Sequence, residues 1–517
     1  MTLTQDQSAV RAMLADPATH GLDPTAEVRQ IETHASLVFL AGGRAVKLKK
    51  AVRYPYLDFS TLQQRLDAAR AELAINRRFA PALYEGLGAV CPDGPGLALH
   101  LPKADGHVPE DLVEPVVVMR RFDIRDQLDH VAERGDLTPA LADRLGIMAA
   151  DIADKAEPVT LDWSAEFFEV VRESLGELDE HPSLFDGAMV ATVRSFLLAW
   201  IDANEATLSQ RAAAGWVRRC HGDLHLRNIV AIDGWPVPFD ALEFDETLAS
   251  TDTAYDLAFL VMDLMSRDLH AQAARSLCTA LALLDDPAAA ALMPVYCATR
   301  AIIRAKVLAT LIQQDPKDGA DQRVDQARAY LALAQRLAGA LRPRLVAIGG
   351  LSGTGKTTAA MHLAPRLGPV ALVIRSDVVR KRLLGLGLFD KAPEASYDRA
   401  TSERVYQAVR EQARTALAAG VPVVLDAVFA KAEERAAAEA LAADGKLPFT
   451  GAWLDLPVHS REQRIAERGA DVSDADAEIT RRQEERVSGD IGWSRLAADL
   501  PLPALTDRLL ALIAEQS

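Results

Sequence analysis

Hydrophobic and polar positions near the start of the chain alternate as they do in short strands. Residues 37–40 (LVFL) and 45–50 (AVKLKK) form two such runs, and the sequence AGGR joins them. Tight hairpin turns require positive φ angles, which glycine adopts at little cost. Gly42 and Gly43 therefore predict a β-hairpin at this point.

A helical pattern follows from Ser60 to Phe79, and VVVM at 116–119 predicts another strand. Mostly helical periodicity continues to residue 341. These elements predict an α+β, protein-kinase-like bilobal domain over residues 1–341. Its small β-rich lobe would cover about 25–120 and its helical lobe about 121–341.

From Arg344 onwards the pattern changes to continuous hydrophobic runs. The run LVAIGG ends in glycines and is typical of a buried parallel strand. Three further runs alternate with helical stretches, which predicts an α/β domain with a parallel sheet over 344–517. LVAIGG covers residues 345–350, and the three further runs are 371–376 (ALVIRS), 421–429 (VPVVLDAVF) and 450–456 (TGAWLDL).

Length and charge limit the classes of function. A chain of 517 residues implies roughly two to four domains. Its formal net charge of -16 repels nucleic-acid backbones and argues against a nucleic-acid partner. The four cysteines form no C-x-x-C pair, which predicts reduced thiols in a cytoplasmic protein. No signal peptide or membrane span is expected.

The strongest motif is GLSGTGKT at 350–357, which fits the phosphate-binding pattern G-x-x-x-x-G-K-[ST] between a strand and a helix. Backbone N–H groups of such a loop converge on phosphates, and the helix N-terminus adds positive potential. We expect Lys356 to act catalytically on the β- and γ-phosphates of ATP or GTP, and Thr357 to ligate Mg²⁺. The predicted nucleotide-binding residues are Gly350, Ser352, Gly353, Thr354, Gly355, Lys356, Thr357 and Thr358.

Two carboxylates follow strands of this domain. Asp426 ends VPVVLD and is a candidate magnesium ligand; the alternative is a helix N-cap. Asp377 follows the second strand and is the candidate catalytic base for an acceptor hydroxyl. Arg375 and Arg380 would then bind an anionic substrate. The alternative is a capping aspartate beside solvated arginines.

Three arginines follow the last predicted strand at helical spacing: Arg461, Arg464 and Arg468. They predict a lid over the transferring phosphoryl group, with Arg464 and Arg468 contacting the nucleotide. A solvated basic helix face is the alternative.

A second motif lies in the first half. HGDLHLRN at 221–228 has the H-x-D-x-x-x-x-N form of a kinase catalytic loop. Asp223 is the candidate catalytic base, and Asn228 is a candidate magnesium ligand. Asp240, in VPFDALEFD, stands in the place of the metal-binding aspartate of a kinase D-F-G segment.

Lys47 is the candidate lysine for the nucleotide phosphates, and Glu72 is its expected ion-pair partner. Lys49 shares the same strand face and competes for that role. An ordinary surface ion pair is the alternative. Asp256 is expected to brace the catalytic loop, and Asp252 to cap a helix or lie on the surface.

These motifs carry two resemblances. GLSGTGKTT, IRSDVVRKRL, VVLDAVF and RIAERGADVSDAD resemble small-molecule kinases of the P-loop class, including gluconate-, zeta-toxin- and polynucleotide-kinase-like members. HGDLHLRNIV, FDALEFDE and DTAYDLAFLVMDL resemble the aminoglycoside-phosphotransferase-like family, one branch of which is fused to a P-loop kinase. The resemblances imply phosphoryl transfer to hydroxyl groups of small molecules, without naming the acceptors.

The leading hypothesis is a bifunctional, magnesium-dependent phosphotransferase that uses ATP or GTP at both sites. Sugars and nucleoside-like compounds are the candidate acceptors. Two alternatives stay open from the sequence. In one, the P-loop domain is a nucleotide-sensing switch for a single kinase; in the other, it phosphorylates nucleic-acid 5′-hydroxyl groups.

Overall fold

The computed structural model describes residues 2–3, 6–33, 35–54, 57–103, 107–243, 246–314, 320–466, 487 and 489–516. The chain packs into two compact units. Unit 1 comprises Met1–Asp136, Lys155–Leu161 and Val217–Thr251, and unit 2 comprises Leu137–Asp154, Asp162–Trp216 and Asp252–Ser517. The predicted boundary near residues 341–344 falls inside unit 2 and stays a prediction.

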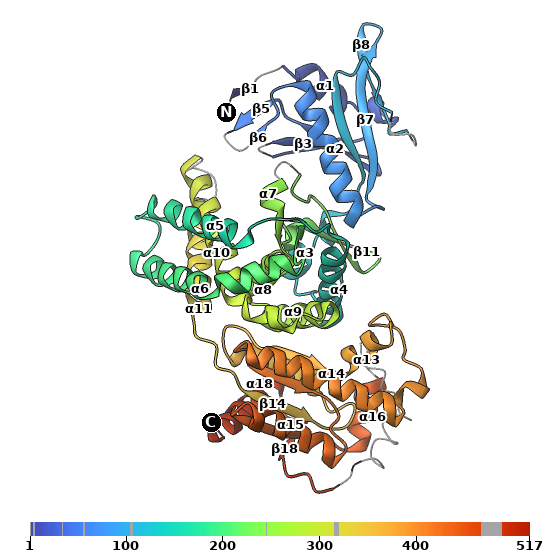
Figure 1. The fold of residues 1–517 in the computed structure, drawn as a ribbon. Helices are drawn as coiled ribbons and strands as arrows, with labels where there is room; N and C mark the ends of the chain where they lie inside the picture. The colour runs from blue at the N-terminus through green and yellow to red at the C-terminus, as the bar shows by residue number, and fades with distance from the viewer. Residues whose placement is uncertain are drawn as a thin grey trace. The chain divides into compact units, whose positions relative to one another are not determined.

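The main sheet of unit 1 has six strands in the described residues, all paired antiparallel (Figure 1). The predicted hairpin is confirmed, although of its two glycines only Gly42 takes a positive φ, 55°. In sheet order the strands are β2 (Arg29–Glu32), β3 (Ser36–Ala41), β4 (Arg44–Lys49), β9 (Glu114–Arg120), β7 (Tyr84–Asp93) and β8 (Gly96–His100).

Alternation along the strands divides the sheet into two faces. One face carries Leu37, Phe39, Val46 and Leu48, and helix α1 (Ser8–Ala15) packs there. The opposite face packs against helix α2 (Leu62–Phe79), the helix that the sequence predicts from Ser60. A capping box between Thr61 and Gln64 begins α2.

Smaller elements complete unit 1. They include the catalytic-loop segment, which folds as a short helical turn followed by a hairpin. The elements are β1 (Thr2–Leu3), η1 (Pro17–His20), β5 (Val52–Tyr54), β6 (Leu57–Asp58), η2 (Ile124–Asp126), α3 (Leu128–Glu133), β10 (Val217–Arg219), η3 (Leu226–Asn228), β11 (Ile229–Ile232), β12 (Trp235–Pro238), α7 (Glu246–Ala249) and β13 (Ser250–Asp252).

Unit 2 begins as an assembly of helices. Trp163, Phe167, Tyr255 and Tyr296 pack at its centre in tilted and edge-to-face arrangements, with ring centroids 5.0–6.3 Å apart. The helices are α4 (Pro139–Lys155), α5 (Trp163–Asp179), α6 (Gly187–Ala213), α8 (Thr253–Ser266), α9 (His270–Leu284), η4 (Pro287–Ala291), α10 (Met293–Gln314) and α11 (Ala320–Leu337).

The rest of unit 2 is a parallel sheet with helices. In its described part five strands pair in the order β15 (Leu372–Arg375), β16 (Val423–Asp426), β14 (Leu345–Gly349), β17 (Phe449–Asp455) and β18 (Ser494–Ala497). This confirms the predicted parallel sheet, while β18 is a strand that the sequence did not predict. The connecting helices are α12 (Lys356–Leu363), η5 (Ala364–Arg366), α13 (Ser376–Leu383), η6 (Glu394–Tyr397), α14 (Arg399–Ala418), α15 (Ala432–Asp444), α16 (Val458–Ala466) and α18 (Leu502–Glu515).

Within the ranges that the structure describes, no helix combines the length and the hydrophobicity needed to cross a bilayer.

Candidate functional site

The glycine-rich loop between β14 and α12 wraps the edge of a cavity of about 730 Å³. Every residue from Ser352 to Thr358 lines this cavity, whereas Gly350 packs against the backbone of Leu454. Gly353 has φ 85°, and a Cβ atom there would lie 2.8 Å from the carbonyl oxygen of Arg461. Glycine is therefore required by both the backbone angle and the space.

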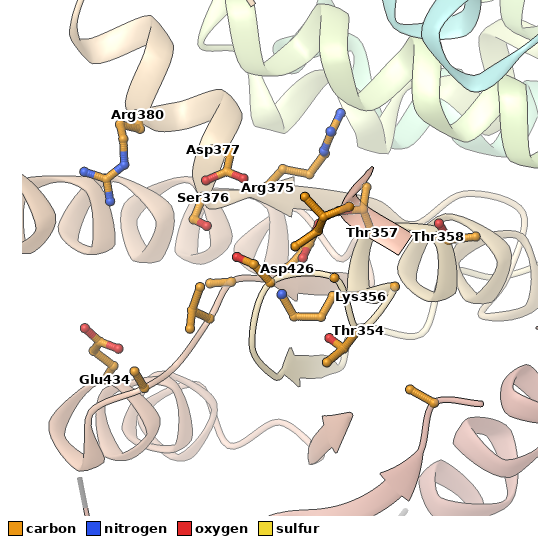
Figure 2. Close-up of a pocket in the computed structure, with 18 of the residues that line it drawn as sticks. Thr354, Lys356, Thr357, Thr358, Arg375, Ser376, Asp377, Arg380, Asp426 and Glu434 are labelled. Carbon is orange, nitrogen blue, oxygen red and sulfur yellow. The ribbon is translucent and has the colours of Figure 1, made fainter. Parts of the chain in front are cut away.

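A hydroxyl and a carboxylate meet at the first turn of α12. Thr357 Oγ1 donates a hydrogen bond to Asp426 Oδ2 at 2.6 Å. Because β14 and β16 are parallel neighbours, their carboxyl ends bring these two residues together (Figure 2). Helix α15 is capped at Lys431, so Asp426 does not serve as its N-cap. Lys356 Nζ, close by, donates to the carbonyl oxygen of Leu351 at 3.2 Å.

Asp377 lies in the first turn of α13, where Arg375 is the N-cap residue. It faces the same cavity as Asp426 and Lys356 (Figure 2). Removal from water and the negative charge of Asp426 raise the pKa of Asp377 above its usual value, although nearby cations oppose the rise. The cavity thus contains a carboxylate whose affinity for a proton is increased.

Both arginines beside Asp377 are buried, so neither is a solvated surface residue. Arg380 lines the cavity, donates to the carbonyl oxygen of Ser396 at 2.6 Å and stacks 4.5 Å from the ring centroid of Tyr397. Arg375 also borders the cavity, but its Nη1 donates to Asp143 Oδ1 at 3.0 Å. Its predicted contact with substrate stays a prediction.

The two described arginines of the predicted lid lie in different surroundings. Arg461 is buried under the glycine-rich loop and its Nε donates to the carbonyl oxygen of Leu456, so it belongs neither to a solvated face nor to the cavity wall. Arg464 lines the cavity and donates to the carbonyl oxygen of Ala498 at 3.0 Å. Arg468 lies outside the described residues.

Several residues of the cavity wall were missed by the sequence analysis, including Tyr397, Tyr406, Lys431 and Glu434. Glu434 Oε2 accepts from the Lys431 N–H in the capping box of α15. Figure 2 shows Glu434 across the cavity from Lys356. These residues belong to no phosphate motif, and the only available signal was the position of Lys431 and Glu434 shortly after the β16 strand.

In unit 1, one buried carboxylate joins the two candidate lysines. Glu72 Oε1 accepts from Lys47 and Oε2 accepts from Lys49, each at 2.8 Å. Lys47 also pairs with Asp240 at 2.6 Å, and Lys49 pairs with Glu243 at 2.6 Å. The sequence left open which lysine pairs with Glu72. In the structure both lysines contact Glu72, and they differ in their second partner. Glu243 was not predicted.

The contacts within this cluster shift the pKa values of Glu72 and Lys47. Burial alone would raise the pKa of Glu72, but the ammonium groups of Lys47 and Lys49 lower it to about 2. Burial opposes the charge of Lys47, yet Asp240 and Glu72 raise its pKa well above the usual value. Asp240 has φ 60°, a left-handed backbone that costs energy in a non-glycine residue. The predicted ion pair is thus a buried one.

The catalytic-loop residues lie together as the motif predicts. Asn228 Nδ2 donates to Asp223 Oδ2 at 2.8 Å, and His225 Nε2 lies 3.4 Å from the same oxygen. Asp240 N–H donates to the Tyr84 hydroxyl at 3.1 Å, a contact that sequence reasoning missed. Asp223 is partly exposed, and its predicted role as a catalytic base stays a prediction.

The two further aspartates are buried in unit 2. Asp252 caps α8 through the Ala254 N–H and pairs with Arg211 at 2.5 Å. The capping alternative is therefore right for Asp252, and the surface alternative is wrong. Asp256 is buried in the first turn of α8, and its predicted role in bracing the catalytic loop stays a prediction.

The chain therefore carries a lysine–glutamate pair with a kinase-type loop, and then a P-loop with a paired hydroxyl and carboxylate. Over 483 residues it is 32% identical to "Uncharacterized protein Rv2004c" of Mycobacterium tuberculosis and to "Uncharacterized protein Mb2027c" of Mycobacterium bovis, covering 90% of this chain and 90% of each relative. The chain belongs to the family of these mycobacterial proteins.

Parts of the chain are similar to further proteins. Residues 345–489 match the family described as AAA domain. A gluconokinase from Sinorhizobium meliloti is 19% identical, covering 34% of this chain and 94% of its own, with a TM-score of 0.26. A choline/ethanolamine kinase family protein from Mesorhizobium loti is 17% identical, covering 63% of this chain and 98% of its own, with a TM-score of 0.36.

Proposed function

We propose that this chain is a bifunctional phosphotransferase that moves the γ-phosphoryl group of ATP or GTP to hydroxyl groups of small-molecule metabolites at two separate sites. The observation that carries the proposal is the cavity of unit 2, because Lys356, the Thr357–Asp426 pair and Asp377 all line it. Phosphoryl transfer needs a phosphate cradle, a counter-charge and a positioned acceptor, and these residues are of the types required.

In the P-loop site the backbone N–H groups of the glycine-rich loop and Lys356 would hold the phosphates. The acceptor oxygen would form its bond to the γ-phosphorus while the bond to the β,γ-bridging oxygen breaks and the nucleoside diphosphate leaves. Asp377 would take the acceptor's proton, and its raised pKa suits it to that task. Arg380, Arg464 and Arg468 would stabilise charge on the acceptor and nucleotide.

The residues present fit a magnesium ion. Mg²⁺ on a nucleotide needs only one or two protein oxygen ligands because the phosphates and water supply the rest. Thr357 Oγ1 and Asp426 provide such oxygens in unit 2, and Asn228 and Asp240 provide them in unit 1. No group of three or more His, Cys, Asp or Glu side chains forms a self-sufficient metal site in the described ranges. Bound magnesium would neutralise charge on the phosphates.

In the kinase-like site Lys47 would hold nucleotide phosphates while Glu72 keeps it in place. Asp223 would orient the acceptor hydroxyl and take its proton. Its hydrogen bond from Asn228 fixes the carboxylate before substrate arrives. The pair Lys47–Asp240 shows that the lysine and the candidate metal ligand lie within contact distance of each other.

The test uses the full chain with Mg²⁺, ATP or GTP and a metabolite extract, and mass spectrometry identifies phosphorylated products. We expect Asp223→Asn and Asp377→Asn to lose different products. Asp507→Asn, which removes an exposed carboxylate of α18, is the matched control and should lose none. A wild-type chain that forms no phosphorylated product would refute the proposal.

The same experiment separates the alternative of a regulatory P-loop domain. In that case Asp377→Asn would lose no product, whereas Lys356→Ala would change the rate at which the Asp223-dependent products form. If Asp377→Asn removes a product of its own, the P-loop site is itself an enzyme.

A further inference from the structure

A buried carboxylate from helix α4 holds residues of two other elements in unit 2. Asp143 is fully buried and receives Arg275 Nη2 of α9 at 2.7 Å and Thr279 Oγ1 of α9 at 2.8 Å. The Oδ1 atom of Asp143 also contacts Arg375 Nη1, at the end of strand β15, at 3.0 Å. A buried ionic cluster of this kind has a defined geometry, because each member restricts the position of the others.

Strand β15 is the edge strand of the parallel sheet in the described part of unit 2. Parallel sheets are normally covered, and an uncovered edge exposes backbone groups. Here α9 contacts β15, and the Val373 N–H donates to Cys278 Sγ of α9 at 3.1 Å. Gly146 of α4 allows close packing onto α9, since a Cβ there would lie 2.5 Å from the Ser276 carbonyl oxygen. Helices α4 and α9 therefore cover the edge of strand β15.

The same strand leads directly into the candidate base. Arg375 is the last residue of β15 and the N-cap of α13, and Asp377 follows two positions later. Figure 2 shows the Arg375 side chain extending away from Asp377 and Asp426. The first turn of α13 is thus held from outside the cavity. Further along α13, Val378 packs with Leu388, Ile147 and Leu283, which fixes the helix on α4 and α9.

We infer that Asp143 is a positioning residue of the P-loop site, which acts through Arg375 to fix the end of β15 and hence Asp377. This inference rests on the proposed phosphotransferase function of that site. It gives Arg375 a structural partner in place of direct substrate contact, and it makes helices α4 and α9 part of the P-loop enzyme. The P-loop segment then depends on helices that precede it by more than 60 residues in the chain.

The experiment uses the full chain carrying Asp223→Asn, so that nucleotide turnover at the kinase-like site is silenced. Release of ADP from Mg·ATP, with water as acceptor, is then measured for Asp143→Asn, Arg375→Met and the double variant. Because sub-ångström displacement of a catalytic group is costly, each single change should lower kcat by about 10-fold to 100-fold. The KM for ATP should stay within about 2-fold, because the phosphate cradle is untouched.

Three comparisons separate positioning from general loss of stability. Arg275→Met removes the other guanidinium from Asp143 and should lower the thermal midpoint without the fall in kcat. Arg375→Lys should recover part of the lost kcat. The double variant should be no slower than the slower single variant, because both changes break one interaction.

Amide hydrogen exchange gives a readout that does not depend on turnover. Residues 376–379 should exchange faster in Arg375→Met than in Arg275→Met. The inference is overturned if folded Asp143→Asn and Arg375→Met keep wild-type kcat, if KM rises instead, or if the two losses multiply. Should the Asp223→Asn parent form no phosphorylated product with the metabolite extract, the proposed P-loop activity has failed, and the hydrogen-exchange comparison still tests the Asp143–Arg375 contact.

Discussion

Lys47 and Lys49 lie on one strand face but have different partners and different exposure. Both contact Glu72, but Lys47 continues to Asp240 and Lys49 continues to Glu243. The Lys47 side chain is 11% exposed, against 2% for Lys49. The more accessible lysine is suited to contact a nucleotide, and the buried one is suited to hold Glu72.

The two lysine variants should therefore fail in different ways. In a Lys356→Ala background, Lys47→Met should abolish most turnover at the kinase-like site with a modest loss of stability. Lys49→Met should cost about 3–5 kcal/mol of folding free energy, because it leaves buried carboxylates without a partner. Turnover and urea midpoints measured on both variants check this. Equal loss of stability in the two would contradict it.

Asp377 is the proposed catalytic base of the P-loop site, and its burial carries a cost to stability. Asp377→Asn should lower turnover at the P-loop site by a factor of about 10² to 10⁴. Since the folded-state pKa is raised, the charged form is disfavoured by folding, and that penalty is present at pH 7 and absent below the usual value of 3.8. Asp377→Asn should thus raise the thermal midpoint at pH 7 but not at pH 3. A variant less stable than wild type at pH 7 would show that the carboxylate stabilises the fold.

Helix α2 is joined to strand β4 by the ion pairs of Glu72. The pKa of the Glu72 carboxyl is lowered from 4.5 to about 2. The ion pairs therefore stabilise the fold above pH 4.5, and this stabilisation is lost as pH falls towards 2. Wild type should exceed Glu72→Gln in unfolding free energy by about 3–5 kcal/mol at pH 7. Chemical unfolding at several pH values should show the difference shrinking below pH 4.5. A difference that is independent of pH would indicate packing instead of charge.

The glycine-rich loop can be tested against a glycine of similar backbone angle. Gly353 has φ 85° and Gly385 has φ 66°, so alanine is strained at both, by about 1 kcal/mol. Only at Gly353 would the added Cβ also meet backbone, at 2.8 Å. Gly353→Ala should weaken nucleotide binding at the P-loop site at least tenfold, whereas Gly385→Ala should leave it unchanged. Calorimetric titration with a non-hydrolysable ATP analogue measures both; equal affinities would contradict the steric argument.

For the molecule as a whole, charge limits the acceptor. A net charge of -16 opposes approach of a nucleic-acid backbone. Labelled γ-phosphate should therefore not pass from ATP to an oligonucleotide with a free 5′-hydroxyl, even at low salt. The control is turnover with the metabolite extract under the same conditions. Transfer that depends on Asp377 would instead favour the polynucleotide-kinase alternative.

Local patterns of the chain determined its two fold types, the parallel strands β14 to β17 and the loops at 221–228 and 350–357, because periodicity and backbone-dictated motifs are written in consecutive residues. The sequence also predicted the Lys47–Glu72 ion pair, but tertiary structure alone decided other contacts of charged residues. The tertiary structure placed Asp143 against Arg375, Glu243 against Lys49 and Glu434 in the cavity wall. These partners are far apart in sequence or lack a motif, and an ion pair forms only where packing brings both charges out of water together.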